Sequence, residues 1–327
     1  MLTRSWLIAV ATVVVAAGLL ATCAPAKHGV PAQLGWAYPT ADKPGFTPDP
    51  PAGPLHVPGS ALSFTKQQAT DDENPPDWFP ADHPAAPFIV AHSRKPGPQA
   101  CAACHLFSGE GFLAAPDIAG LPAAYIVEQV HEFHAGRRVS AEAGRPDAHE
   151  MIVEAQRVSD AELAQAATYF SALPRRPWAH VVETDTVPVT RPSQFGWMYA
   201  VPNGGEEPLG DRIIELPADV NRMFLSDPHV GIVDYAPKGA VARGEALVKS
   251  GGLSGLACAT CHGVNLKGQG AAPPIAGRAA SYVARALWDI ETGARNGPTV
   301  ALMQPEVAGL TPADITSISA YLASRTP

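Results

Sequence analysis

The sequence has few cysteines, no excess of positive charge and no apolar run long enough to be an obvious membrane span. Its 31 Asp and Glu residues outnumber its 23 Lys and Arg residues, which gives a formal net charge of −8. A negative balance argues against nucleic acid as a partner. The uncharged apolar run from Trp6 to Ala21 is shorter than the about 20 residues that a transmembrane helix needs.

Residues 1–26 have the pattern of an export signal, in which Arg4 supplies the positive start and Ala24 to Ala26 a small-x-small cleavage site. An uncleaved membrane anchor is one alternative. Lipid attachment through Cys23 is another, because Leu20 to Cys23 resembles a bacterial lipoprotein box, although Thr22 departs from the usual small residue. Each option places the rest of the chain in the bacterial periplasm or on the periplasmic face of the cytoplasmic membrane.

Of the five cysteines, all but Cys23 belong to two Cys-x-x-Cys-His runs, Cys101 to His105 and Cys258 to His262. This run is the attachment signature of a c-type haem. Two thiols about one helical turn apart can each bond a vinyl-derived carbon of the porphyrin, and the next residue presents an imidazole to the iron. The sequence therefore predicts two covalently attached c-type haems.

Three other interpretations compete for the cysteine pairs: a four-cysteine zinc site, a thioredoxin-like redox couple and a short disulfide. The pairs are separated by far more than the roughly 15–20 residues of a zinc ribbon. A redox couple or a disulfide does not explain why a histidine follows both pairs. Haem attachment explains all three features that both runs share: the two thiols, their spacing and the histidine.

The two runs belong to an internal repeat. The segment from Ala115 to Gly120 recurs as Ala272 to Gly277 at the same offset as the cysteine pairs. Without a gap, Tyr125 then matches Tyr282, Gly136 matches Gly293 and Arg138 matches Arg295. After a five-residue deletion in the second copy, Met151 matches Met303 and Tyr169 matches Tyr321. One module is thus present twice.

The pattern of apolar residues in each module predicts an all-α fold. Helices are expected at 122–135 and from the capping box at 159–162 to Pro174 in the first copy, and at 242–248, 281–292 and from 311 in the second. The expected organisation is a Pro-rich arm over 27–96, module one over 97–174, a Pro- and Gly-rich connector over 175–239 and module two over 240–327. A short strand is expected within 213–216. Because each module is small, a covalently held haem is expected to supply part of its core.

The arm contains 14 prolines between Pro39 and Pro98 and is expected to be extended and irregular. Its large apolar side chains predict that it packs, with its later half against module one. These side chains are Trp36, Tyr38, Phe46, Phe64, Trp78 and Phe79. Packing or surface roles are likewise expected for residues that could otherwise ligate iron, namely His83, His92, His180, His229, Met198 and Met223.

The natural source of a distal ligand in module one is the stretch from His149 to Met151, which lies between the two predicted helices. A methionine thioether is a soft ligand that favours ferrous iron. His149 leaves a bis-histidine first site as the alternative.

The twin attachment runs, the Pro-x-Ile-Ala-Gly segments and the late methionines resemble the tandem dihaem class I cytochromes c of bacteria, of the cytochrome c-four type. The resemblance covers about 97–174 and 240–326. It implies that the porphyrins are held by Cys101, Cys104, Cys258 and Cys261, with His105 and His262 as proximal and Met151 and Met303 as distal ligands. Module one departs from the family pattern because a Pro-rich stretch replaces the helix before its attachment run.

Irons with two protein ligands each are closed to substrate, so we expect an electron-transfer protein rather than an enzyme. It would carry single electrons in the periplasm, as a free carrier or as the cytochrome subunit of an exported dehydrogenase, with a dehydrogenase or a terminal oxidase as partner. The alternative is a dihaem enzyme, peroxidase-like or thiosulfate-oxidising, in which one haem is open or bis-histidine ligated.

Overall fold

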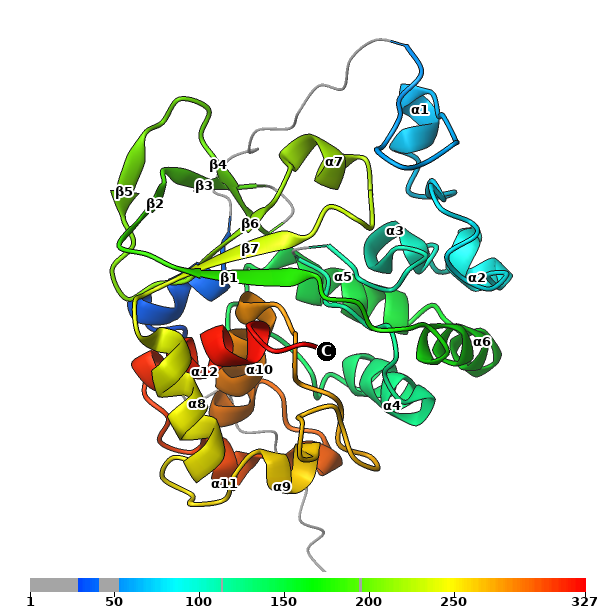
Figure 1. Ribbon diagram of the computed structural model, residues 1–327. Coiled ribbons are helices and arrows are strands. Elements are labelled where there is room, and N and C mark those ends of the chain that lie inside the picture. Colours follow the sequence, from blue (N-terminus) through cyan, green and yellow to red (C-terminus); the bar gives the residue numbers. More distant parts are fainter. Residues whose placement is uncertain (1–28, 41–52, 113, 194–195) are drawn as a thin grey trace, which may run out of the picture.

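The computed structural model describes residues 29–40, 53–112, 114–193 and 196–327. Three sequence-based predictions lie outside these residues: the export signal of residues 1–26, lipid attachment at Cys23 and packing of Phe46. Figure 1 shows two groups of helices, one early and one late in the chain, with strands of the segment between them packed against the late group.

Module one consists of short helices around one apolar core, as predicted. The helices around this core are α2 (Phe88–Ala91), which the arm contributes, and α3 (Ala102–His105), α4 (Ala123–His134), α5 (Pro146–Ala155) and α6 (Asp160–Ser171). The predicted capping box begins α6, where the Ser159 side chain accepts a hydrogen bond from the Glu162 amide and the Glu162 side chain accepts one from the Ser159 amide. Ala167 and Phe170 of this helix are buried in one apolar cluster with Ile126 of α4 and Ile89 of α2.

Module two repeats this arrangement with α8 (Ala240–Ser250), α9 (Ala259–His262), α10 (Ala280–Thr292), the 3-10 helix η2 (Pro298–Leu302), α11 (Gln304–Val307) and α12 (Pro312–Ala323). Helices α8 and α12 cross at Gly244. A Cβ atom added there would lie 1.9 Å from the Ser317 carbonyl oxygen, so glycine is required for the two backbones to approach this closely. A capping box of Thr311 and Asp314 begins α12.

The all-α prediction is wrong for the connector, which is neither all-helical nor irregular. It forms β1 (Ala179–Glu183), β2 (Thr186–Pro188), β3 (Thr190–Pro192), β4 (Met198–Ala200), β5 (Glu206–Pro208), β6 (Ile214–Pro217), α7 (Val220–Phe224) and β7 (Ile232–Ala236). Strands β1, β7 and β6 make one sheet in that order, with β1 parallel and β6 antiparallel to β7. Only the strand expected within 213–216 was predicted. Strands β2 to β5 have three residues each and are too short to show alternation, and the buried face of the five-residue β7 carries Asp234, which interrupts the apolar pattern.

The sheet is part of module two's core rather than a separate layer. Ala236 of β7 is fully buried in the same apolar cluster as Ile315 of α12, and Figure 1 shows β1 and β7 running beside this helix. A second cluster contains Trp178, Trp197 and Met223 of the connector, together with Ala114 of module one and Ala279 of module two. The connector therefore joins the modules through side-chain packing as well as through the chain.

The arm packs on both modules. As predicted, its later half lies on module one, where Ile89 and Val90 of α2 enter the core. Its first described segment, η1 (Ala32–Ala37), packs in the core of module two instead. There the Tyr38 hydroxyl donates to Asp289 of α10 at 2.8 Å. The earlier half was not predicted to reach the second module, because no local pattern shows which distant surface an aromatic side chain covers.

Candidate haem sites

Each attachment run forms a single helical turn that ends at the histidine. Helix α3 carries Cys104 and His105, and α9 carries Cys261 and His262. The residue that follows each histidine has a positive φ, 57° at Leu106 and 82° at Gly263. The chain therefore turns sharply after the imidazole in both modules, although a non-glycine residue makes the turn in module one.

The two histidines are oriented in the same way. His105 Nδ1 lies 3.1 Å from the Pro116 carbonyl oxygen, and His262 Nδ1 lies 2.7 Å from the Pro273 carbonyl oxygen. A carbonyl only accepts, so Nδ1 carries the proton and the Nε2 lone pair is left for a metal. Burial lowers the pKa of both imidazoles, which keeps them neutral at pH 7. Both rings therefore suit iron ligation through Nε2.

The geometry of the described residues gives no support to the competing kinds of site. Among the described residues, neither pair is joined in a disulfide, and no group of three or more His, Cys, Asp or Glu side chains could hold a zinc ion. Burial raises the pKa of the Cys101 thiol to about 12 and also raises that of Cys258. A thioredoxin-like couple needs the opposite shift, towards the thiolate.

The predicted distal methionines lie in different local structures. Met151 is half-buried in the middle of α5, and Met303, also half-buried, separates η2 from α11 and packs on the core of module two. His149 is exposed. Residues two apart on a helix point to different sides, so Met151 and His149 do not present their side chains to the same space. This arrangement favours Met151 over His149 as a ligand.

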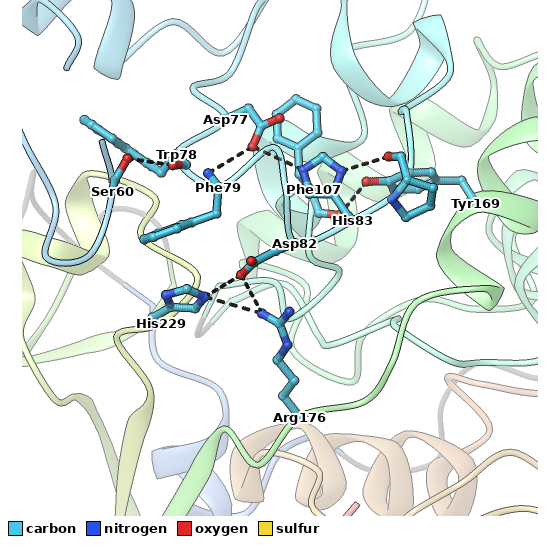
Figure 2. Close-up of polar contacts among 11 residues, drawn as sticks. Ser60, Asp77, Trp78, Phe79, Asp82, His83, Phe107, Tyr169, Arg176 and His229 are labelled. Carbon is cyan, nitrogen blue, oxygen red and sulfur yellow. Dashed lines mark hydrogen bonds and ion pairs between the residues drawn. The ribbon is translucent and has the colours of Figure 1, made fainter. Parts of the chain in front are cut away.

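Three of the other histidines, His83, His92 and His229, are engaged elsewhere. His83 Nε2 lies 3.2 Å from Asp77, and its ring stacks on Phe107, two residues after His105, with centroids 5.4 Å apart. His92 contacts Asn74 at 3.0 Å. The bond between His229 and Asp82, at 3.0 Å, joins the connector to the arm. Figure 2 shows the contacts of His83 and His229, which lie between the arm, the connector and the turn after α3. The packing roles predicted for these side chains agree with their contacts.

Arginines that the sequence marked only as repeat positions meet at the boundary between the modules. The backbones of Arg138 and Arg295 pair in an isolated antiparallel bridge. Arg295 donates to the Tyr125 hydroxyl at 2.9 Å and to Gln129 Oε1 at 2.7 Å, and Arg138 donates to the same Gln129 oxygen at 3.0 Å. Their equivalence in the repeat was the available signal, but nothing in the sequence shows that the two positions touch.

Three arginines bring positive charge close to Tyr282 at this boundary. Burial by itself would raise the pKa of Tyr282, yet Arg138, Arg295 and Arg278 hold it at about 8. The Nε atom of Arg295 and the amide nitrogen of Gln129 are buried donors without a partner. Such donors fit carboxylate groups, and a haem brings two propionates. The residues at the boundary therefore suit the anionic edge of a haem, while His105 and His262 suit its iron.

The cytochrome c family model matches residues 98–174 and 241–326. The chain is 34% identical over 80 residues to cytochrome c-554(547) of Halothiobacillus neapolitanus, and this match covers 22% of the chain and 88% of that relative. The chain belongs to the cytochrome c family. With two attachment runs and two matched regions, this cytochrome is a tandem dihaem protein of class I, and its cofactors are two covalently bound c-type haems.

Two longer relatives extend the likeness. Cytochrome c4 of Pseudomonas aeruginosa strain PAO1 is 38% identical over 112 residues, which is 32% of this chain and 54% of that protein. The thiosulfate dehydrogenase electron acceptor of Thiomonas intermedia strain K12 is 26% identical over 244 residues, 74% of this chain and 85% of that protein. The match thus spans about half the length of the cytochrome c4 but most of the electron acceptor.

None of the helices in the described part of the chain is long and apolar enough to cross a membrane.

Proposed function

We propose that this cytochrome is a periplasmic electron carrier of bacteria that passes electrons singly through two haems, each ligated by histidine and methionine. The observation that carries the proposal is the duplicated imidazole geometry, in which both Nδ1 atoms are bonded to a proline carbonyl and both Nε2 atoms remain available. The ligand pairs are His105 with Met151 and His262 with Met303. Bound haem iron supplies the one-electron ferric and ferrous states.

The protein contributes the positions and the electrostatics of the two centres. The Pro116 and Pro273 carbonyls fix the imidazole rings and increase their basicity. The thioethers of Met151 and Met303 favour the ferrous state. The buried arginines at the module boundary act in the same direction, because positive charge stabilises the more reduced centre. These groups hold both irons closed and at comparatively high potential, which suits electron transfer rather than turnover of a small substrate.

We propose an exported dehydrogenase as the electron donor. The Thiomonas relative is named as an acceptor of electrons from thiosulfate dehydrogenase, and it aligns with 74% of this chain. A thiosulfate-oxidising enzyme is therefore the first donor to test. The expected result is rapid reduction of both haems when the enzyme and thiosulfate are added together, and none when either is omitted.

The two modules offer different surfaces to such partners. Residues 97–174 contain four Lys or Arg and ten Asp or Glu residues, whereas residues 240–327 contain seven and five. Module two instead exposes apolar side chains beside its attachment run and Met303: Leu253 (80% exposed), Leu256 (41%), Val264 (91%) and Leu302 (80%). The repeat places Pro96, Gln99, Phe107 and Glu150 at these positions in module one. We propose that basic partners meet module one and that apolar partner surfaces meet module two.

Haem content tests the proposal most directly. The mature protein should contain two haems per chain by the pyridine haemochrome assay, and both should stain after denaturing electrophoresis. Replacing Cys258 and Cys261 together by Ala should leave one haem, and the matched change at Cys101 and Cys104 should remove the other. Two covalent haems in either double variant would contradict the assignment of that site.

A further inference from the structure

The loops that orient the two proximal histidines are tied to each other by one side chain. Pro116, whose carbonyl accepts from His105, is followed by Asp117; Pro273, whose carbonyl accepts from His262, is followed by Pro274. Arg278 reaches both loops. Its Nε donates to the Pro274 carbonyl at 3.1 Å, and its Nη1 donates to Asp117 Oδ1 at 2.8 Å and also to the Asp117 carbonyl.

This link is shielded from water. The Arg278 side chain is 4% exposed and that of Asp117 is 14% exposed. Arg175 closes the cluster from the end of module one by donating to Asp117 Oδ2 at 3.2 Å and to the Ala276 carbonyl at 2.8 Å. Charged hydrogen bonds with little access to solvent are strong and directional. The Asp117 and Pro274 peptides are therefore held in a fixed relation across the module boundary.

The link is not a by-product of the duplication. The repeat aligns Arg278 with Leu121 and Asp117 with Pro274. Neither counterpart can form the equivalent bond, because Leu121 has no donor in its side chain and Pro274 has no carboxylate. Leu121 is buried in the apolar core of module one. The bond between Arg278 and Asp117 therefore has no counterpart between positions 121 and 274, and it depends on residues in which the two modules differ.

We propose that Arg278 is a positioning residue that couples the two haem centres by joining Asp117 and Pro274, the residues that directly follow the two prolines whose carbonyls orient His105 and His262. This inference rests on the proposed ligation by those two histidines. The carbonyl that accepts from Nδ1 sets the orientation and basicity of a ligating imidazole. Arg278 and Asp117 adjoin both of these carbonyls, so a displacement at one histidine is transmitted to the peptide that holds the other.

The test compares Arg278→Gln and Asp117→Asn, singly and together, with Arg243→Gln as control. Arg243 pairs with Asp314 at 2.6 Å, also in module two, on a more exposed surface. The measurements are the two midpoint potentials and the proton NMR spectrum of the ferric protein, whose haem-methyl shifts report the orientation of the axial imidazole. Arg278→Lys keeps the charge but lacks the planar guanidinium group whose nitrogens bond both loops. This variant replaces Arg278→Gln in the test if Arg278→Gln does not fold.

We expect Arg278→Gln to change the haem-methyl shifts of both modules, although the substitution lies in module two. Asp117→Asn should change the same signals, and the double variant should change them no more than either single variant. The equilibrium constant for electron sharing between the haems should change by up to about tenfold, which is about 59 mV for one electron. The control should alter neither shifts nor potentials.

A simple charge effect gives a different result. Removing a cation and removing an anion would then move the potentials in opposite directions, would cancel in the double variant and would leave the haem-methyl shifts of module one unchanged. That outcome, or a change confined to module two, would overturn the coupling. Failure of the underlying ligation is distinguished separately: a His105→Gly variant that kept the parent spectrum and both potentials would remove His105 as a ligand.

Discussion

Glu215 and Asp234 lie directly opposite one another on the antiparallel strands β6 and β7, and both carboxyl groups are buried. They meet the first turn of α10 in module two, where Glu215 accepts hydrogen bonds from the Ser281 amide at 3.1 Å and hydroxyl at 2.8 Å, and Asp234 accepts one from the Ala280 amide at 3.4 Å. Burial, and then the charge of Glu215, raises the pKa of Asp234 well above its ordinary value. The sheet is therefore joined to α10 through a carboxyl group that holds its proton to a higher pH than an exposed aspartate does.

This pair makes the stability of the connector dependent on pH. An acid whose pKa is raised in the folded state contributes stability that is complete below its ordinary pKa, near 4, and is lost as the pH rises through the folded value. Asp234→Asn keeps a donor for Glu215 and an acceptor for Ala280 without titrating. Relative to the parent, its free energy of unfolding should therefore increase with pH and exceed that of the parent at alkaline pH by about 1 kcal/mol.

Denaturant unfolding at acid and alkaline pH measures this difference. The control is Asp185→Asn, which removes an exposed carboxylate paired with Lys238 and should give the same difference from the parent at both pH values. An equal difference in unfolding free energy between Asp234→Asn and the parent at both pH values would contradict the raised pKa of Asp234.

Met303→His should keep its iron six-coordinate and lower one midpoint potential, because imidazole favours ferric iron relative to a thioether. Met151→His should lower the other potential, and the ferric spectrum of each variant should lose half of the methionine-to-iron charge-transfer band. Met223 is buried in the apolar cluster that joins the modules, so Met223→Leu is the control. A titration of Met303→His that overlaid that of the parent would show that Met303 is not a ligand.

The parent protein should bind carbon monoxide slowly after reduction, since the gas must displace a methionine from either iron. Stopped-flow absorbance measures the rate. Prompt binding at one haem per chain, together with repeated turnover of peroxide, would favour the dihaem enzyme over the carrier.

Arg295→Gln should lower at least one midpoint potential, because it removes a buried positive charge from the module boundary and its bonds to Tyr125 and Gln129. We expect a shift of about 59 mV, a tenfold change in the reduction equilibrium. Arg325→Gln changes a cation near the C-terminus that lies 5.4 Å over the Tyr321 ring and should shift the potentials less. Equal shifts in the two variants would indicate a general effect of net charge.

The apolar side chains of module two should determine how partners approach it. Leu253→Gln combined with Val264→Gln should slow electron exchange between reduced and oxidised copies about tenfold, a loss of about 1.4 kcal/mol of transition-state binding. Phe88→Gln changes a 59% exposed apolar residue on α2 of module one and should leave the rate unchanged. NMR line broadening measures the exchange.

The potentials of the double variant should match those of the parent. Changed potentials would mean that Leu253 and Val264 pack against the haem rather than face a partner. Electron exchange between two copies of the parent protein should change little in rate with salt. Exchange with a basic redox protein at the acidic module one should slow with salt, because salt screens charges beyond a Debye length of about 10 Å at 0.1 M.

Local chemistry allowed the sequence to determine the cofactor and the helical modules. The Cys-x-x-Cys-His run contains both thioether positions and the proximal imidazole within five residues, so its meaning does not depend on the rest of the fold. The capping boxes at Ser159 and Thr311 are equally local, since each side chain bonds a backbone amide three residues away. The repeat identified equivalent positions without any knowledge of their neighbours.

The tertiary structure decided the contacts between segments far apart in the chain. Strands of three to five residues are stabilised by a partner strand more than by their own pattern, and β7 has the buried Asp234 on its core face, so the connector sheet was missed. The boundary contacts of Arg138 with Arg295 and of Asp117 with Arg278, and the packing of Tyr38 on α10, join positions between 157 and 251 residues apart. Which donor meets which acceptor over such distances depends on how the two modules, the arm and the connector pack together, and a sequence pattern with a period of a few residues carries no information about it.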